Sequence, residues 1–266
     1  MDIGTAKASA EVRRRIPHRM VDIADPADDY TVRQFQRAGR AAIAEVLIGG
    51  GRVVIAGGSG LHFRALVDPM TFAPTDPDVR AAFESLGLPE LRERLLAADP
   101  AASDVVDTAN PRRIARALEI HAITGQTPTE RANTDEARRM AAYESELAFS
   151  AFGVDPDDGL KDRVASRFHA MVEAGLLDEV AGLAPRLGAT ASQAVGYKEL
   201  LPVVRGEVPL EEGTRDAVGA TRALVKRQRT WFRRDPRIAW LAWQDGSDED
   251  IESAVAAIRE RVSWTS

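Results

Sequence analysis

The chain has 266 residues, of which 44% are hydrophobic, and it contains no cysteine. This length and composition allow a substantial core, as one large domain or as a core with an insertion, and they argue against disorder. The absence of cysteine excludes disulfides, thiolate metal sites and a cysteine nucleophile. A net charge of −6, from 35 basic and 41 acidic residues, restricts any contact with nucleic acid to a local basic surface.

No segment suggests export or a membrane. The first twenty residues lack the apolar core of a signal peptide, and no apolar run approaches bilayer length. The lack of cysteine is compatible with a reducing compartment. We therefore expect a soluble cytoplasmic protein.

The first predicted element is a helix that begins near Thr31. Thr31 followed by Gln34 fits a capping box, and apolar residues repeat at helical spacing until the glycines at 49–51 stop the helix. Residues 52–56, which read RVVIA, form a short continuous apolar run. Such a run is typical of a strand buried on both faces of a parallel sheet.

GGSG at residues 57–60 follows this predicted strand. Its glycines permit a tight turn and a close approach to a ligand, and residues 61–66 predict another helix. The succession indicates an α/β crossover, although it is also common as plain scaffolding. A hydrolase elbow is excluded because Leu61 stands where the last glycine should be, and no GxGxxG or GxxxxGK[ST] motif occurs.

Residues 70–140 predict an inserted helical module, because polar helices alternate there with prolines. Asn110 and Pro111 suit the start of a helix that Gly125 ends. We therefore expect an α/β core formed by residues 1–69 and 141–266 and interrupted by residues 70–140.

Arg112, Arg113 and Arg116 form a cationic cluster in this predicted helix. The cluster indicates either a surface for anions or a solvated face that Glu119 partly neutralises.

Another strand and another helix are predicted after the module. Residues 147–154 read as a buried strand that returns to the sheet. The next segment is amphipathic, and its apolar side includes Val164 and Phe168. Arg163 and Arg167 lie one turn apart on a different side, where they could bind one pyrophosphate or form surface salt bridges.

The most basic stretch lies between Arg222 and Arg237, where seven of sixteen residues are Lys or Arg. In a helix, the cations at 222, 226, 229 and 233 share one face, which is suited to tracking phosphates. Trp231 and Phe232 within the stretch could stack on bases or anchor the helix to a core. The alternative is an ordinary solvated helix face.

Several segments occur in a fixed order along nearly the whole chain. They are MDIGTAK at 1–7, IPHRMVDI at 16–23, GGSGLHFRAL at 57–66, NPRRIARALEI at 110–120, RVASRFHAMVEAGLLDEV at 163–180, QAVGYKEL at 193–200 and KRQRTWFRR at 226–234. Together they closely resemble the tRNA dimethylallyltransferase family. This ordered match is more specific than any one of the motifs.

The resemblance implies a P-loop-kinase-like parallel sheet core with an inserted helical domain. It also implies transfer of a dimethylallyl group from dimethylallyl diphosphate to N6 of the adenosine 3′ of the anticodon in tRNA. Family members use Mg²⁺ and a cationic grip on the leaving pyrophosphate, while a carboxylate takes the proton of the attacking amine. The implied partners are the tRNA anticodon stem-loop and dimethylallyl diphosphate, with no membrane, and we expect a monomer.

The resemblance also implies roles for individual residues. It assigns pyrophosphate binding to Arg167, supported by Arg163. It assigns tRNA contacts to Ser59, Arg80, Arg112, Arg113, Ile114, Ala115, Arg116, Gln193, Ala194, Val195, Gly196, Tyr197, Lys198, Lys226, Arg227, Gln228, Arg229, Thr230, Trp231, Phe232 and Arg233. We assign no protein-built metal site, because the histidines have no ligand spacing among them.

The chain departs from the family pattern at three positions of these segments. Ser59 replaces a threonine and keeps the hydroxyl, and Arg19 replaces a histidine. His62 replaces a tyrosine and could stack, form a hydrogen bond or simply pack as a neutral ring.

A larger departure concerns the segments that precede MDIGTAK in the family. These are a first strand, a GPTxxGKT phosphate loop, a helix and a DSxQxY segment with the general-base aspartate, and none of them occurs in this sequence. We expect the natural protein to carry them upstream of Met1, since a chain without the central first strand should be unstable. The alternative is a catalytically inactive tRNA-binding remnant. Modification of free adenine nucleotide is disfavoured by the basic segments that match tRNA contacts.

Overall fold

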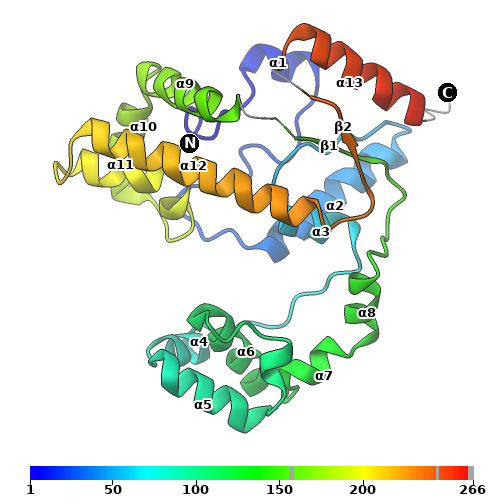
Figure 1. The fold of residues 1–266 in the computed structure, drawn as a ribbon, viewed down its shortest axis with the longest axis vertical. Helices are drawn as coiled ribbons and strands as arrows, with labels where there is room; N and C mark the ends of the chain where they lie inside the picture. Colours follow the sequence, from blue (N-terminus) through cyan, green and yellow to red (C-terminus); the bar gives the residue numbers. More distant parts are fainter. Residues whose placement is uncertain (156–158, 244–245, 263–266) are drawn as a thin grey trace. The chain divides into compact units, whose positions relative to one another are not determined.

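The computed structural model describes residues 1–155, 159–243 and 246–262, and the chain divides into two compact units. The core unit joins Met1–Leu66 to Phe149–Ser266, and the insert unit comprises Val67–Ala148. Figure 1 traces the chain through both units. The boundaries expected from the sequence lie at 69/70 and 140/141.

A parallel pair of strands lies in the core unit (Figure 1). β1 (Ala151–Val154) pairs with β2 (Ile238–Leu241), with Ala151 opposite Ile238. The described chain between these two strands forms four α-helices, which provide the long crossover that parallel neighbours require. The described part of the chain is thus mostly helical with a small parallel sheet.

The core unit contains eight described α-helices and one main hydrophobic cluster. The helices are α1 (Ala10–Arg15), α2 (Val32–Ile48), α3 (Gly60–Val67, which ends at the unit boundary), α9 (Leu160–Glu173), α10 (Leu176–Leu183), α11 (Tyr197–Val204), α12 (Leu210–Phe232) and α13 (Asp248–Arg261). The cluster takes buried residues from α9, α10, α11 and α12. Val164 and Phe168 are among them, which confirms the predicted apolar face of α9.

The insert unit has a hydrophobic cluster of its own. Its helices are α4 (Pro77–Glu84), α5 (Leu88–Ala98), α6 (Pro111–Thr124), α7 (Pro128–Ala132) and α8 (Asp135–Ala141). Leu91 and Leu95 of α5 pack with Ile114 and Leu118 of α6. Short 3₁₀ turns lie in the insert unit at Ala102–Asp104 and in the core unit at Ala184–Arg186 and Ala191–Gln193.

The helix ends follow the predicted capping signals. The Thr31 side chain accepts a hydrogen bond from the Gln34 amide at 3.2 Å, and the Gln34 side chain accepts one from the Thr31 amide at 2.8 Å. Asn110 caps α6 through the amides of residues 112 and 113, and Gly125 ends α6 with a φ of 73°. These local signals succeed because both partners lie within one turn of the chain.

The predicted strand at 52–56 is wrong. The structure has no strand there, and the side chains of Val54 and Ile55 are 81% and 46% exposed. An apolar run becomes a strand only where neighbouring strands pair with its backbone, and in the described sheet β1 pairs only with β2. The strand predicted at 147–154 exists only over Ala151–Val154 and is half-buried rather than buried.

None of the described helices has both the length and the apolar composition needed to cross a bilayer.

Candidate functional site

The glycine loop, residues 57–60, packs directly against the C-terminal half of α12. A Cβ atom on Gly60 would lie 2.0 Å from Trp231 Cε3, and one on Gly58 would lie 2.5 Å from Gln228 Nε2. Only glycine permits this approach, which is the use predicted for the loop. The structure therefore brings Ser59 into the same site as α12.

Aromatic rings fix this junction. Phe232 lies 5.3 Å from Trp231 and 6.2 Å from Phe63 of α3, measured between ring centroids. The Arg237 guanidinium lies 5.6 Å from the centre of the Phe63 ring and donates to the buried carboxylate of Asp235 at 2.9 and 2.6 Å. Burial alone would raise the pKa of Asp235, but the hydrogen bonds from Arg237 hold it below its usual value.

Ser59 and His62 form a pair within the glycine loop and the first turn of α3. Ser59 Oγ lies 2.7 Å from His62 Nδ1, and the ring of Phe35 meets His62 edge-on at 4.6 Å. Burial lowers the pKa of His62, which keeps the ring neutral near pH 7. Histidine at this position therefore packs and also orients the Ser59 hydroxyl.

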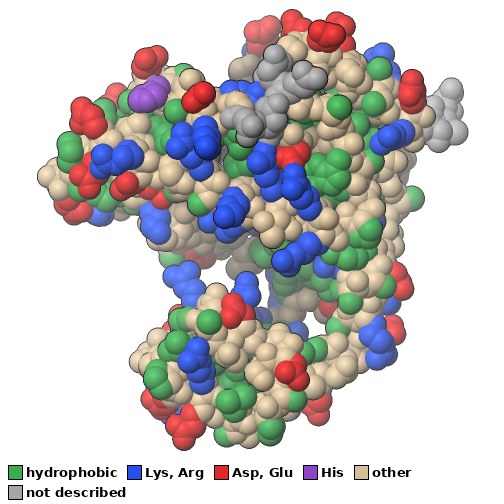
Figure 2. All heavy atoms as spheres, in the orientation of Figure 1, with side chains coloured by type: hydrophobic (Ala, Val, Ile, Leu, Met, Phe, Trp, Pro, Cys, Tyr) green, Lys and Arg blue, Asp and Glu red, His purple; other side chains and the backbone are tan. Residues whose placement is uncertain are grey.

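The C-terminal half of α12 forms an exposed basic surface. All buried residues of α12 lie in its first half, between Gly213 and Val218. Lys226, Arg227 and Arg233 are exposed, and Figure 2 shows Lys and Arg side chains gathered over this helix. A groove of 360 Å³ lies here, lined by Lys226, Arg227, Thr230, Trp231 and Arg234.

Arg163 and Arg167 lie on α9, which packs beside α12. The Arg222 side chain on α12 donates to the Lys161 carbonyl at 3.2 Å. Arg163 is half-buried, and its Nη1 would lie 3.8 Å from a Cβ on Gly246, in the segment that follows β2. The Arg167 side chain is exposed and forms no hydrogen bond or ion pair with any residue that the structure describes. The Arg167 guanidinium is thus available to an anionic ligand.

One acidic residue lies within the basic surface. Asp155 directly follows β1, and its Oδ1 lies 2.5 Å from Arg229 Nε. Its carboxylate also accepts a hydrogen bond from Arg233. Two of the cations predicted to contact tRNA are therefore paired with an internal carboxylate in this structure.

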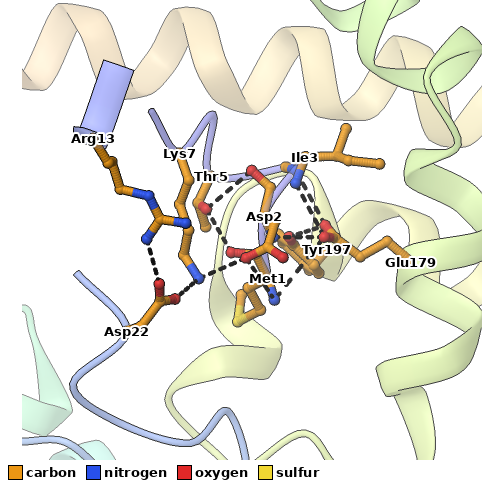
Figure 3. Close-up of polar contacts among 10 residues, drawn as sticks. Met1, Asp2, Ile3, Thr5, Lys7, Arg13, Asp22, Glu179 and Tyr197 are labelled. Carbon is orange, nitrogen blue, oxygen red and sulfur yellow. Dashed lines mark hydrogen bonds and ion pairs between the residues drawn. The ribbon is translucent and has the colours of Figure 1, made fainter. Parts of the chain in front are cut away.

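The N-terminal loop is held by a half-buried carboxylate (Figure 3). Glu179 of α10 accepts hydrogen bonds from the backbone amides of Asp2, Ile3 and Gly4 at 2.5, 3.0 and 3.2 Å, and from the hydroxyl of Tyr197. Burial alone would raise the pKa of Glu179, but these hydrogen bonds lower it to about 2. Burial and the bond to Glu179 raise the pKa of Tyr197.

The insert unit carries a separate basic cavity of 630 Å³. Its lining includes five arginines, namely Arg80, Arg112, Arg113, Arg116 and Arg131. Arg116 is structural, because it donates to the carbonyls of Ala73 and Pro74 at 2.9 Å each and to buried Glu119 at 2.7 Å. Arg112 is exposed, as expected of an RNA contact.

Three residues predicted to contact tRNA have buried side chains. Ile114 and Tyr197 are fully buried and Ala115 is 1% exposed, so these side chains pack inside their units. Gly196 is also buried, whereas Gln193 and Lys198 of the same segment are exposed and Ala194 and Val195 are half-buried. Each apolar or aromatic side chain fills its unit's core, and Tyr197 also finds a polar partner in Glu179.

Sequence reasoning missed Asp155, Arg131 and Arg234. Arg234 carried a detectable signal, since it continues the basic run. Asp155 carried none, because it reaches Arg229 and Arg233 through an approach between elements that are distant in the sequence, and Arg131 stands outside the basic runs. Among residues 1–155, 159–243 and 246–262, no group of three His, Cys, Asp or Glu side chains could hold a metal ion.

A parallel strand pair with a glycine loop, an exposed arginine on α9 and a basic groove on α12 is an arrangement suited to phosphate-bearing ligands. Comparisons with known proteins define the protein further. Residues 1–235 match the family model described as IPP transferase. The chain belongs to this family.

The most similar relatives include two proteins named tRNA dimethylallyltransferase. The protein of Paenarthrobacter aurescens is 40% identical over 97% of this chain and 82% of its own length. That of Streptomyces avermitilis is 42% identical over 91% of this chain and 78% of its own length.

Solved structures agree in fold. The tRNA isopentenylpyrophosphate transferase of Bacillus halodurans is 32% identical, with a TM-score of 0.66, over 98% of this chain and 84% of that one. The corresponding protein of Staphylococcus epidermidis is 27% identical, with a TM-score of 0.66, over 98% and 87%. These neighbours confirm the P-loop-kinase-like fold class expected from the resemblance.

Proposed function

We propose that this protein is a tRNA dimethylallyltransferase. It transfers a dimethylallyl group from dimethylallyl diphosphate to N6 of the adenosine 3′ of the anticodon, position 37. The family match over residues 1–235 carries this proposal, and the exposed cations on α9 and α12 support it. Because tRNA is the substrate, we expect the protein to act in the cytoplasm, and we expect a monomer.

The reaction forms a bond between N6 and the terminal carbon of the dimethylallyl group and breaks the bond from that carbon to the diphosphate oxygen. Pyrophosphate leaves with the electron pair of the broken bond, and N6 gives up one proton to a base. The chemistry therefore needs cations that stabilise the charge developing on the leaving group.

Arg167 is the residue that we assign to the leaving pyrophosphate, with Arg163 one turn away as support. The exposed guanidinium of Arg167 has no competing hydrogen bond among the described residues, so it can donate two parallel bonds to the diphosphate. Among the described residues no group of three carboxylate, cysteine or histidine side chains could hold a metal ion.

We assign tRNA binding to exposed and half-buried residues of the basic surfaces. On the core unit these are Ser59, Gln193, Lys198, Lys226, Arg227 and the cations that follow them on α12. The partly exposed ring of Trp231 beside the glycine loop offers a surface on which a base can stack. On the insert unit, Arg80, Arg112, Arg113 and Arg131 line the basic cavity, which suits contact with RNA phosphates.

The decisive experiment incubates the protein with dimethylallyl diphosphate, Mg²⁺ and unmodified tRNA, followed by digestion and mass spectrometry of the nucleosides. We expect N6-dimethylallyladenosine at position 37 and none when that adenosine is replaced by guanosine. An excess of AMP should not compete. Binding of tRNA without product would contradict the transfer activity, and product on AMP would indicate a free-nucleotide enzyme.

A further inference from the structure

Asp155 lies where ligands usually bind in parallel α/β structures. It is the first residue after β1, at the carboxyl end of that strand, and ligands of such folds bind outside the carboxyl ends of the strands. Its carboxylate faces Arg229 and Arg233, which are one turn apart on α12. An anion therefore already occupies this pair of arginines, and that anion is part of the protein.

The fit between Asp155 and Arg229 is incomplete. Asp155 Oδ1 and Arg229 Nε are 2.5 Å apart, yet they are not aligned as a hydrogen bond. Neither atom has another hydrogen-bond partner among the described residues, and both are shielded from solvent. Arginine prefers forked bonds to an oxyanion, and a phosphate group offers more acceptor oxygens than one carboxylate does. A phosphate could therefore satisfy Arg229 better than Asp155 does.

Both arginine side chains keep part of their surface in water. The side chain of Arg233 is 63% exposed, and that of Arg229 is 34% exposed. The ion pair of the exposed Arg233 contributes little to stability, because water already solvates its charge. The clearer effect of Asp155 is to cancel positive potential on the surface that must attract an anionic substrate.

We propose that Arg229 and Arg233 form a site for a phosphate group and that Asp155 is its internal occupant, which the ligand phosphate displaces. The phosphate belongs either to the RNA backbone or to the diphosphate of the donor. This inference rests on the proposed function. Because the ligand must first break the contacts of Asp155, this carboxylate lowers the affinity of the wild-type protein.

The test compares Asp155→Asn with Glu207→Gln. Both variants remove one negative charge from the core unit, but Glu207 pairs at 2.6 Å with Arg205, which is outside the proposed surface. For Asp155→Asn we expect tRNA to bind about threefold to tenfold more tightly, with a steeper dependence of log K on log salt. Glu207→Gln should bind like the wild type. The same comparison with inorganic pyrophosphate identifies the source of the phosphate, because affinity rises only for the ligand that uses this site.

The proposal would be overturned if Asp155→Asn gained no more affinity than Glu207→Gln for either ligand, tRNA or pyrophosphate. Asp155→Glu keeps the charge and should retain wild-type affinity, and thermal denaturation shows whether each variant is folded. A measurement on the wild type covers the case in which Asp155→Asn does not fold. In ¹⁵N spectra of arginine side chains, tRNA or pyrophosphate should shift Arg229 and Arg233 but not Arg205, and unchanged Arg229 and Arg233 signals with both bound would contradict the site.

Failure of the proposed function has a different signature. Wild-type protein that binds tRNA but forms no prenylated adenosine would contradict the transfer activity and leave this phosphate site standing.

Discussion

Arg167 differs from Arg229 and Arg233 in the contacts of its side chain. Arg229 and Arg233 contact Asp155, whereas the guanidinium of Arg167 is exposed and has no hydrogen bond or ion pair among the described residues. A cation without an internal partner does not have to break a contact when it binds an anion. It can therefore stabilise charge that develops on the leaving group.

We expect Arg167→Ala to lower the rate of dimethylallyl transfer by about 100-fold or more, because it removes a donor to the leaving pyrophosphate. The affinity for tRNA should change by less than about threefold, since one phosphate contact at most is lost. Steady-state kinetics and filter binding measure the two effects. Lys161→Ala removes a cation from the same helix and should leave transfer near the wild-type rate, while equal loss of transfer and tRNA affinity in Arg167→Ala would contradict the assigned role.

For individual residues, the sequence predicted the exposed positions of charged side chains better than the roles of buried side chains. The exposed cations of α12 could be predicted because helical spacing places them on the side away from the apolar residues. The roles of Tyr197 and Asp155 could not, because each depends on a partner far away in the sequence, Glu179 for one and Arg229 for the other. Nothing in a single segment reveals such a partner.

At the scale of elements, Glu179 joins three segments that the sequence shows only separately. It belongs to α10, it accepts a hydrogen bond from the hydroxyl of Tyr197 at the start of α11, and it accepts hydrogen bonds from three successive amides of the N-terminal loop (Figure 3). Gly4 allows this contact, because a Cβ there would lie 2.5 Å from the Tyr197 ring. The loop is therefore anchored by an ionised carboxylate.

This anchor should make stability depend on pH. The pKa of Glu179 is lowered from 4.5 to about 2, so its contribution is complete above pH 4.5 and is lost as the pH falls toward 2. We expect Glu179→Gln to lower the free energy of unfolding at pH 7 by about 1–3 kcal/mol and the difference from wild type to narrow below pH 4.5. Urea denaturation at several pH values measures this, with exposed Asp178→Asn on the same helix as the control. A difference that is constant down to pH 3 would contradict the anchor.

The elements themselves were predictable where their signals are local. Thr31, Asn110 and Gly125 mark helix ends because each acts on amides or carbonyls within a turn of itself. The strand at 52–56 failed because a strand depends on partners that its own residues do not specify.

At the scale of the whole molecule, two separate hydrophobic clusters are the main feature. Leu95 lies in the cluster of the insert unit and Leu200 in that of the core unit, and both side chains are fully buried. No buried residue is shared between the two clusters. The stability of each unit should therefore respond mainly to changes in its own cluster.

We expect Leu95→Ala to destabilise the insert unit by about 2–5 kcal/mol, through lost burial and the cavity left behind. Hydrogen exchange followed by mass spectrometry should then show faster exchange in residues 67–148 and little change elsewhere. Leu200→Ala is the matched control and should give the reverse pattern. Faster exchange in both units from either variant would show that they unfold as one.

The ordered segments identified the family because they depend on many positions at once, and the comparisons confirm it over residues 1–235. The unit boundaries depend on where packing stops, which no motif encodes. The structure places them at 66/67 and 148/149, whereas composition suggested 69/70 and 140/141.

The contact between Gly60 and Trp231 couples the effects of substitutions at two positions that are far apart in the sequence. A methyl group at position 60 would overlap the indole ring, so alanine there requires a smaller residue at 231 to restore the fit. Each single substitution should disturb the packing between residues 60 and 231, whereas the double substitution can restore it. A suppressor of a Gly60 variant should therefore be sought first at Trp231.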